Sequence, residues 1–186
     1  MSREFETVLA MHCAPLLYCK KPAVLLPETP LPQLCEWDLL RHHGLRVLRM
    51  RRRTGSPLVF VYKPELLAQA VAHPLAYSAL CKRGYACDKH LNVLLVELRR
   101  RVRASSDFPH EIGFFLGYPP EDVLGFIAER DGDRRECKLC GTWKVYGDAE
   151  LAAATFEEYA QYRRALLQEI DCGRSIFNVI PSALAG

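Results

Sequence analysis

The sequence predicts one α/β or α+β domain in which helices cover a small mixed sheet with one β-hairpin. Helical and strand-like segments alternate along the chain, which is typical of this fold class. Two strand-like segments, residues 45–53 and 57–63, are joined by Thr54-Gly55-Ser56, and this pattern predicts the hairpin. Residues 58–62 are apolar at consecutive positions, so they are expected to form a central strand covered on both faces.

The segments before the hairpin are expected to be a helix, a strand and a second helix. Residues 3–12 form the first helix, and Pro15 is expected to prevent its continuation. Residues 23–26 form a short buried strand. Residues 30–43 form the second helix, with Gly44 as its C-terminal cap.

The elements after the hairpin follow from proline, cap residues and apolar spacing. They are helices over residues 64–72 and 74–83, a helix that Asp88 caps, a helix that begins at Pro120, a strand over 142–146 and a long helix that Asp148 caps. No linker interrupts residues 1–171, which are expected to form the single domain. Residues 172–186 are weakly patterned and are expected to be a loosely packed tail.

Composition excludes several classes of partner. The net charge of +3 is too small to indicate nucleic acid. No apolar run approaches the length that spans a membrane, and the first ten residues are too polar for a secretory signal. The eight cysteines are therefore expected to be reduced thiols in the cytoplasm, several of them small buried hydrophobes.

The segment Phe108–Pro119 is the most informative part of the chain. It places His110 and Glu111 in an otherwise apolar stretch that two glycines and two prolines punctuate. Burying two such side chains costs free energy unless they form hydrogen bonds or ion pairs or take part in a functional site. The sequence therefore predicts a site around His110.

Three blocks of this sequence resemble a bacterial family catalogued as domain of unknown function 3793. The blocks are His12-Cys13-Ala14-Pro15, then residues 108–127, and then residues 141–148 with Phe156 and Tyr159. The resemblance covers most of the chain and implies a bacterial, intracellular protein. It supplies no mechanism, because the activity of the family is not established.

A thiol-dependent catalytic site is one interpretation of these residues. Cys13 would be the nucleophile, His110 its base and Glu111 the orienting carboxylate, with Cys13 held at a corner that Pro15 enforces. Neighbouring residues point in different directions on a helix or strand, so Glu111 is poorly placed to orient His110. The alternative is a buried cysteine and a hydrogen-bonded histidine that only fix the packing of two loops.

A metal site is a second interpretation. Cys137 and Cys140 form a CxxC pair, and zinc or iron needs further ligands that no second CxxC supplies. His12 and Cys13 would complete the set only if the fold brought them close. The alternatives are a redox pair, which usually opens a helix rather than preceding a strand, or ordinary reduced cysteines.

A binding site for a small planar molecule is a third interpretation. The aromatic residues around His110 are expected to form core or an apolar pocket, and His12, Tyr118 and Trp143 are the candidate ligand contacts. The arginine clusters at residues 46–53 and 99–103 are expected to be structural, with phosphate binding as the alternative.

The acidic pair Glu121-Asp122 is expected to serve only the helix dipole at the start of its helix. Its replacement by amides is therefore predicted to cost little stability. The function predicted best is a small-ligand- or metal-binding module. A thiol-dependent hydrolase or transferase and a non-catalytic interaction protein remain as alternatives.

Overall fold

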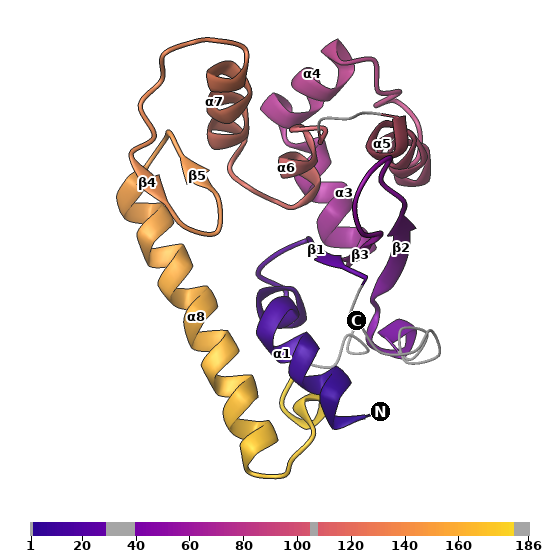
Figure 1. Cartoon of the computed structure of the whole chain (residues 1–186), viewed down its shortest axis with the longest axis vertical. Helices are drawn as coiled ribbons and strands as arrows, with labels where there is room; N and C mark the ends of the chain where they lie inside the picture. Colours follow the sequence, from indigo (N-terminus) through magenta and orange to yellow (C-terminus); the bar gives the residue numbers. More distant parts are fainter. Residues whose placement is uncertain (1, 29–39, 105–107, 181–186) are drawn as a thin grey trace.

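The computed structural model describes residues 2–28, 40–104 and 108–180 and confirms the mixed α and β composition of the chain (Figure 1). The helices are α1 (Arg3–Leu17), η1 (Leu40–His43), α3 (Pro64–Ala72), α4 (Pro74–Lys82), α5 (Leu91–Ala104), α6 (Ile112–Phe115), α7 (Pro120–Arg130), α8 (Ala149–Asp171) and η2 (Ile176–Asn178). The strands are β1 (Ala23–Pro27), β2 (Arg46–Met50), β3 (Leu58–Tyr62), β4 (Leu139–Cys140) and β5 (Lys144–Val145).

The main sheet has the strand order β1-β3-β2, and the predicted hairpin is its β2–β3 pair. In register, Phe60 lies opposite Leu25 of β1 and Leu48 of β2. Both pairings are antiparallel, so the described sheet is not the mixed one that the alternation of helices and strands suggested. The central position of β3 confirms the prediction from its continuous apolar run.

Helices cover the two faces of this sheet, and β3 contributes to both interfaces (Figure 1). Leu58 and Phe60 pack into the core that α3 to α7 form on one face. Val59 and Val61 pack into the core that α1 and the C-terminal half of α8 form on the other. This division follows from the alternation of side chains along a strand.

The β4–β5 hairpin lies beside α7 and the N-terminal part of α8, away from the main sheet (Figure 1). A third apolar cluster is centred here on Trp143, Val145, Ala152 and Tyr159. The predicted strand at 142–146 is present as β5, and Asp148 caps α8 by accepting hydrogen bonds from two backbone nitrogens. A cavity lies between this hairpin, α7 and the segment before α6.

The prediction that Pro15 prevents continuation of the first helix is wrong, because α1 extends to Leu17. Proline lacks the N–H that would donate to the carbonyl of Met11, but one missing bond near a helix end is tolerated. Cys13 to Leu17 are all buried against β1 and α8. Tertiary packing therefore outweighs the local cost of the proline.

Two further expectations differ in detail. The helix expected after Asp88 begins at Leu91, and most of the helix expected over residues 30–43 lies outside the described residues. Its last turn is η1, and Gly44 closes it with φ +71°. The tail is less loose than expected as far as residue 180, because Ile176 is fully buried and its backbone nitrogen donates to Glu6.

Candidate functional site

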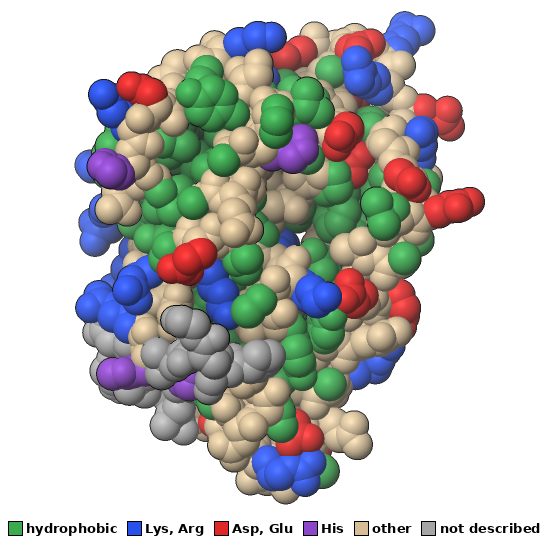
Figure 2. Space-filling model, turned by 180° about the vertical axis from the view of Figure 1, so that it is seen from behind, with side chains coloured by type: hydrophobic (Ala, Val, Ile, Leu, Met, Phe, Trp, Pro, Cys, Tyr) green, Lys and Arg blue, Asp and Glu red, His purple; other side chains and the backbone are tan. Residues whose placement is uncertain are grey.

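An apolar cavity of about 390 Å³ lies between the segment before α6, the helix α7 and the strand β5. We call it the aromatic cavity. Its walls are Phe108, His110, Ile112, Gly113, Tyr118, Asp122, Val123, Phe126, Trp143 and Lys144. From behind, apolar side chains gather in the upper half of the molecule, where the surface is hollowed (Figure 2). Of the residues that the sequence singled out, His110, Tyr118 and Trp143 meet here.

The turn between α6 and α7 positions the aromatic walls. The short helix α6 ends at Phe115, and Pro119-Pro120 starts α7 one turn later, so Tyr118 is held between two fixed elements. The Tyr118 ring stacks on Trp143 with a centroid separation of 5.2 Å. Burial raises the pKa of the Tyr118 hydroxyl, so this wall is uncharged at neutral pH.

His110 packs edge-on against Phe126, with ring centroids 5.0 Å apart at an angle of 85°. Within the described part of the chain, no hydrogen bond from the His110 imidazole to another residue is found. An imidazole offers one donor and one acceptor when neutral. His110 is therefore one polar group of the cavity wall that is free to bind a ligand.

Asp122 is the group that the sequence analysis misjudged. Its side chain is almost fully buried, and it accepts hydrogen bonds of 2.7 Å from the Trp143 indole and from the backbone nitrogens of Tyr146 and Gly147. Asp122 therefore clamps β5 and the following turn onto α7, in addition to facing the helix dipole. A first-turn carboxylate is so common a helix signal that its tertiary role could not be recognised from sequence.

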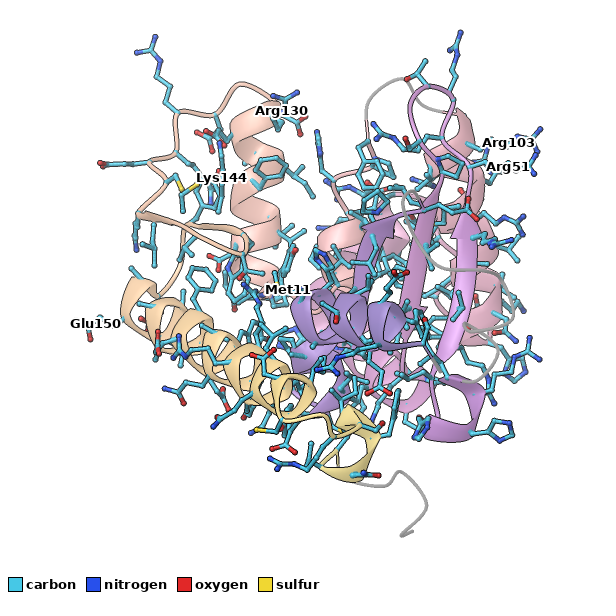
Figure 3. All side chains as sticks on the ribbon, turned by 60° about the horizontal axis from the view of Figure 1, so that its bottom comes forward. Met11, Arg51, Arg103, Arg130, Lys144 and Glu150 are labelled. Atoms are coloured by element: carbon cyan, nitrogen blue, oxygen red, sulfur yellow. The ribbon has the colours of Figure 1, made fainter. Side chains whose placement is uncertain are left out.

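Lys144 stands at the polar edge of the cavity, between the β4–β5 hairpin and α7 (Figure 3). Its ammonium lies 3.0 Å from the Glu129 carboxylate and 5.5 Å from the centre of the Phe126 ring. Tyr146 also donates to Glu129, which holds the pKa of that carboxyl below its usual range. The alternation of Trp143 inward and Lys144 outward agrees with the expected pleat of the strand.

Glu111 faces away from His110 and binds other partners. Its carboxylate accepts a hydrogen bond from the Tyr85 hydroxyl at 3.1 Å and pairs with Arg101 at 3.3 Å. Arg101 also lies over the Tyr85 ring. The predicted orientation of His110 by Glu111 is therefore absent, and Glu111 joins α6 to α5 instead.

Cys13 lies fully buried in the core between α1 and α8, and it does not line the aromatic cavity. Burial raises the pKa of its thiol to about 12, so the thiolate is scarce at neutral pH. The expected shared pocket of Cys13 and His110 is therefore not formed. His12, the neighbouring candidate, is exposed on another face of α1.

The predicted metal ligands do not converge. Cys137 and Cys140 lie at the β4–β5 hairpin, and the Cys137 thiol donates to the Leu139 carbonyl. Among the described residues, no group of three or more His, Cys, Asp or Glu side chains could hold a metal ion. The donor set therefore does not fit zinc or iron, which take four ligands in structural sites.

Cys19 is a thiol that sequence reasoning did not single out. It follows α1 in the left-handed conformation, with φ 57°, and the Lys63 ammonium donates to its sulfur at 2.7 Å. Lys63 is buried and Cys19 is exposed. The only sequence signal was the run Cys19-Lys20-Lys21 before a proline, which is too short to indicate a site.

The two arginine clusters meet at one edge of the molecule. Arg51, after β2, and Arg103, at the end of α5, lie close together (Figure 3). With Val96, Arg99 and Arg100 they line a groove of about 250 Å³. Arg100 is held by Glu97, whereas no ion pair of Arg51, Arg99 or Arg103 is found in the described chain. The two clusters are far apart in the sequence, and only the fold brings them together.

These features define a protein of mixed α/β class with a three-stranded antiparallel sheet and an aromatic cavity beside it. The family model described as protein of unknown function (DUF3793) matches residues 9–180, and the chain belongs to this family. The comparisons with curated proteins and with solved structures gave no match. No helix of the described residues is long and apolar enough to cross a membrane.

Proposed function

We propose that this protein binds a small planar molecule in the aromatic cavity, with His110 as the group that orients it. The observation that carries the proposal is the combination of four aromatic walls with an imidazole that has no hydrogen-bond partner among the described residues. Ligand sites are typically apolar cavities of several hundred cubic ångströms with few polar groups. Neither a metal nor Cys13 is part of this proposal.

The walls favour a flat, mainly apolar ligand. Tyr118, Phe126 and Trp143 present ring faces and edges, which gain most from stacking on another ring. Asp122 has three hydrogen bonds within the protein and Lys144 is paired with Glu129. Neither side chain can bind a ligand without giving up one of these interactions. The ligand therefore needs one polar atom for His110 and no net charge.

We also infer that the protein works in the cytoplasm of a bacterium. The bacterial source rests on the family resemblance. The seven described cysteines, Cys13, Cys19, Cys81, Cys87, Cys137, Cys140 and Cys172, are all free thiols, which suits a reducing compartment.

Binding of N-phenyl-1-naphthylamine, a neutral aromatic dye that fluoresces in apolar surroundings, tests the proposal. A Trp37→Phe background leaves Trp143 as the single tryptophan, so energy transfer from Trp143 reports binding of the dye to the protein, and the variant Phe126→Ala assigns the dye to the aromatic cavity. We expect saturable transfer, and several-fold weaker binding after Phe126→Ala because a ring contact is lost.

Phe177→Ala is the matched control, since Phe177 is also half-buried but packs near α1 and α8. It should bind the dye as the parent does. Absence of saturable dye binding, or equal affinity of the two alanine variants, would contradict the proposal and would indicate that these motifs only stabilise the fold.

A further inference from the structure

A second cavity of about 390 Å³ lies across Tyr118 from the aromatic cavity. We call it the lysine cavity. Its walls include Lys21, Pro22, Leu66, Phe114, Tyr118 and Pro119, with Gln69 and His73 of α3 at its rim. It therefore combines a cationic group with apolar walls, and nothing in the proposed function uses it.

Two lysines in this region are buried without a carboxylate. Lys21 is 7% exposed and Lys63 is 6% exposed. Lys63 has the sulfur of Cys19 as its partner. By contrast, Lys20, which also lines this cavity, is half exposed and pairs with Glu158 at 3.4 Å. A buried ammonium without an anion costs several kcal/mol of folding free energy. Packing alone therefore does not explain the presence of Lys21 at this position.

The Lys21 ammonium lies 4.8 Å from the centre of the Tyr118 ring, and no hydrogen bond or ion pair of its side chain is found in the described chain. Every fully enclosed side-chain nitrogen or oxygen that is described has a hydrogen-bond partner. The Lys21 ammonium is therefore not fully enclosed, and Lys21 lines the lysine cavity. The lysine cavity is therefore a space from which an anion could reach this cation.

The backbone around Lys21 is built for this placement. The nitrogens of Lys20 and Lys21 both donate to the Pro15 carbonyl, which closes the turn after α1 and forces Cys19 into a positive φ. Gly117, with φ +72°, lies so close to Pro22 that a Cβ there would meet the proline ring at 2.3 Å. Only glycine fits this close approach, and the next residue, Tyr118, has its ring beside the Lys21 ammonium.

We propose that the lysine cavity binds a small organic anion, with Lys21 pairing with its carboxylate or phosphate group. The prolines, Leu66 and Phe114 cover the apolar body of the ligand. An inorganic ion would leave these walls unfilled, whereas a neutral molecule would leave Lys21 without a partner. The burial that makes Lys21 costly in the free protein strengthens its attraction for the bound anion.

Calorimetric titration with three ring compounds of similar shape tests this site. Cyclohexanecarboxylate and cyclohexyl phosphate are the anions, and cyclohexanecarboxamide is the neutral control. We expect at least one anion to bind at millimolar concentration and the amide to bind roughly tenfold more weakly or not at all. The stronger of the two anions identifies the ligand as a carboxylate or a phosphate.

Lys21→Met keeps the aliphatic packing on Tyr118 and removes the charge, so it should weaken anion binding roughly tenfold or more. Lys21→Arg should retain binding in part, and Lys82→Met, which removes an exposed lysine of α4, should leave it unchanged. Thermal unfolding of each variant verifies that it is folded.

Three results would overturn the proposal: equal binding of the amide and the anions, equal binding by Lys21→Met and the parent, or no binding of either anion. Lys144 does not line the lysine cavity and is paired with Glu129, so Lys144→Met should not affect anion binding there. Loss of binding in Lys144→Met alone would assign the anion to the aromatic cavity instead.

Discussion

Trp143 donates its indole N–H to the carboxylate of Asp122 at 2.7 Å, and this bond joins the β4–β5 hairpin to the first turn of α7. The second oxygen of Asp122 accepts from the nitrogens of Tyr146 and Gly147. One side chain thus fixes a wall of the aromatic cavity and the turn that leads into α8.

Asp122→Asn should lower the free energy of unfolding by about 1–3 kcal/mol. Asparagine can still accept from Tyr146 and Gly147, but its amide group would then face the Trp143 N–H, donor against donor. Glu121→Gln, which changes an exposed neighbour in the same turn, should stay within about 0.5 kcal/mol. Urea denaturation of both variants measures the difference, and equal stabilities would refute the clamp.

Trp143→Ala should cost about 3–5 kcal/mol, as a large truncation in a buried cluster. It removes the ring that stacks on Tyr118 and leaves Asp122 with one acceptor unfilled. Trp143→Phe separates the two effects, because it keeps most of the apolar area and loses the donor. If Trp143→Phe is as unstable as Trp143→Ala, the hydrogen bond rather than ring packing dominates.

Arg101→Met should destabilise the protein by about 1–3 kcal/mol, because it leaves the buried Glu111 carboxylate without its cation. Arg100→Met is the matched control. Both arginines belong to α5 and pair with Glu97, but the Arg100 side chain is 65% exposed. Exposed pairs contribute about 0–1 kcal/mol. Chemical denaturation of the two variants should therefore separate them, and an equal loss would remove the role assigned to Glu111.

Cys19 should react with iodoacetamide faster than any other described cysteine in the native protein. It is exposed, and the Lys63 ammonium lies 2.7 Å from its sulfur, which is the electropositive surrounding typical of reactive cysteines. Cys13 should react only on unfolding, since burial raises its pKa to about 12. Mass spectrometry of timed samples gives the order of labelling. Lys63→Gln should slow Cys19 but not the exposed Cys172, and a slowing of both would mean general loss of structure.

Lys21→Met should raise the free energy of unfolding at pH 7 by an amount on the order of 3 kcal/mol. Burial lowers the pKa of Lys21 from its usual 10.5 to about 8, so the folded state binds fewer protons than the unfolded state between these values. The parent protein therefore gains stability from this lysine as pH rises through that window, and the advantage of the variant shrinks.

Denaturation curves of the parent and the Lys21→Met variant at pH 7 and at pH 10 measure this difference. Ionisation of the Cys13 thiol would also shift the pKa of Lys21, but burial raises the Cys13 pKa to about 12, so this thiol stays uncharged at both pH values. An advantage of the variant that does not change with pH would mean that Lys21 is not the titrating group.

Local features of the sequence determined most of the secondary structure. The hairpin, the central strand and the caps Gly44 and Asp148 depend on neighbouring residues, and they lie where they were expected. The extension of α1 through Pro15 was not predictable in this way. Packing of Cys13 to Leu17 against distant elements decided it.

The aromatic cavity was partly predictable. His110, Tyr118 and Trp143 stood out as polar or aromatic residues in an unusual context, and all three line it. Sequence could not pair them with Asp122, because a carboxylate in a first helical turn already has a local explanation. The prediction that Cys13 lies beside His110 was wrong. The sheet separates the core that contains Cys13 from the core beside His110.

The sequence by itself therefore determined the class of the fold, the helices and strands, and the region around His110, because these depend on short-range periodicity and on residue type. Only the tertiary structure decided which partners the charged and reactive groups obtain. Glu111 pairs with Arg101, Cys19 with Lys63, and Lys21 with no carboxylate that is described. These outcomes depend on contacts between residues distant in the chain, and a single sequence does not encode such distances in its local pattern.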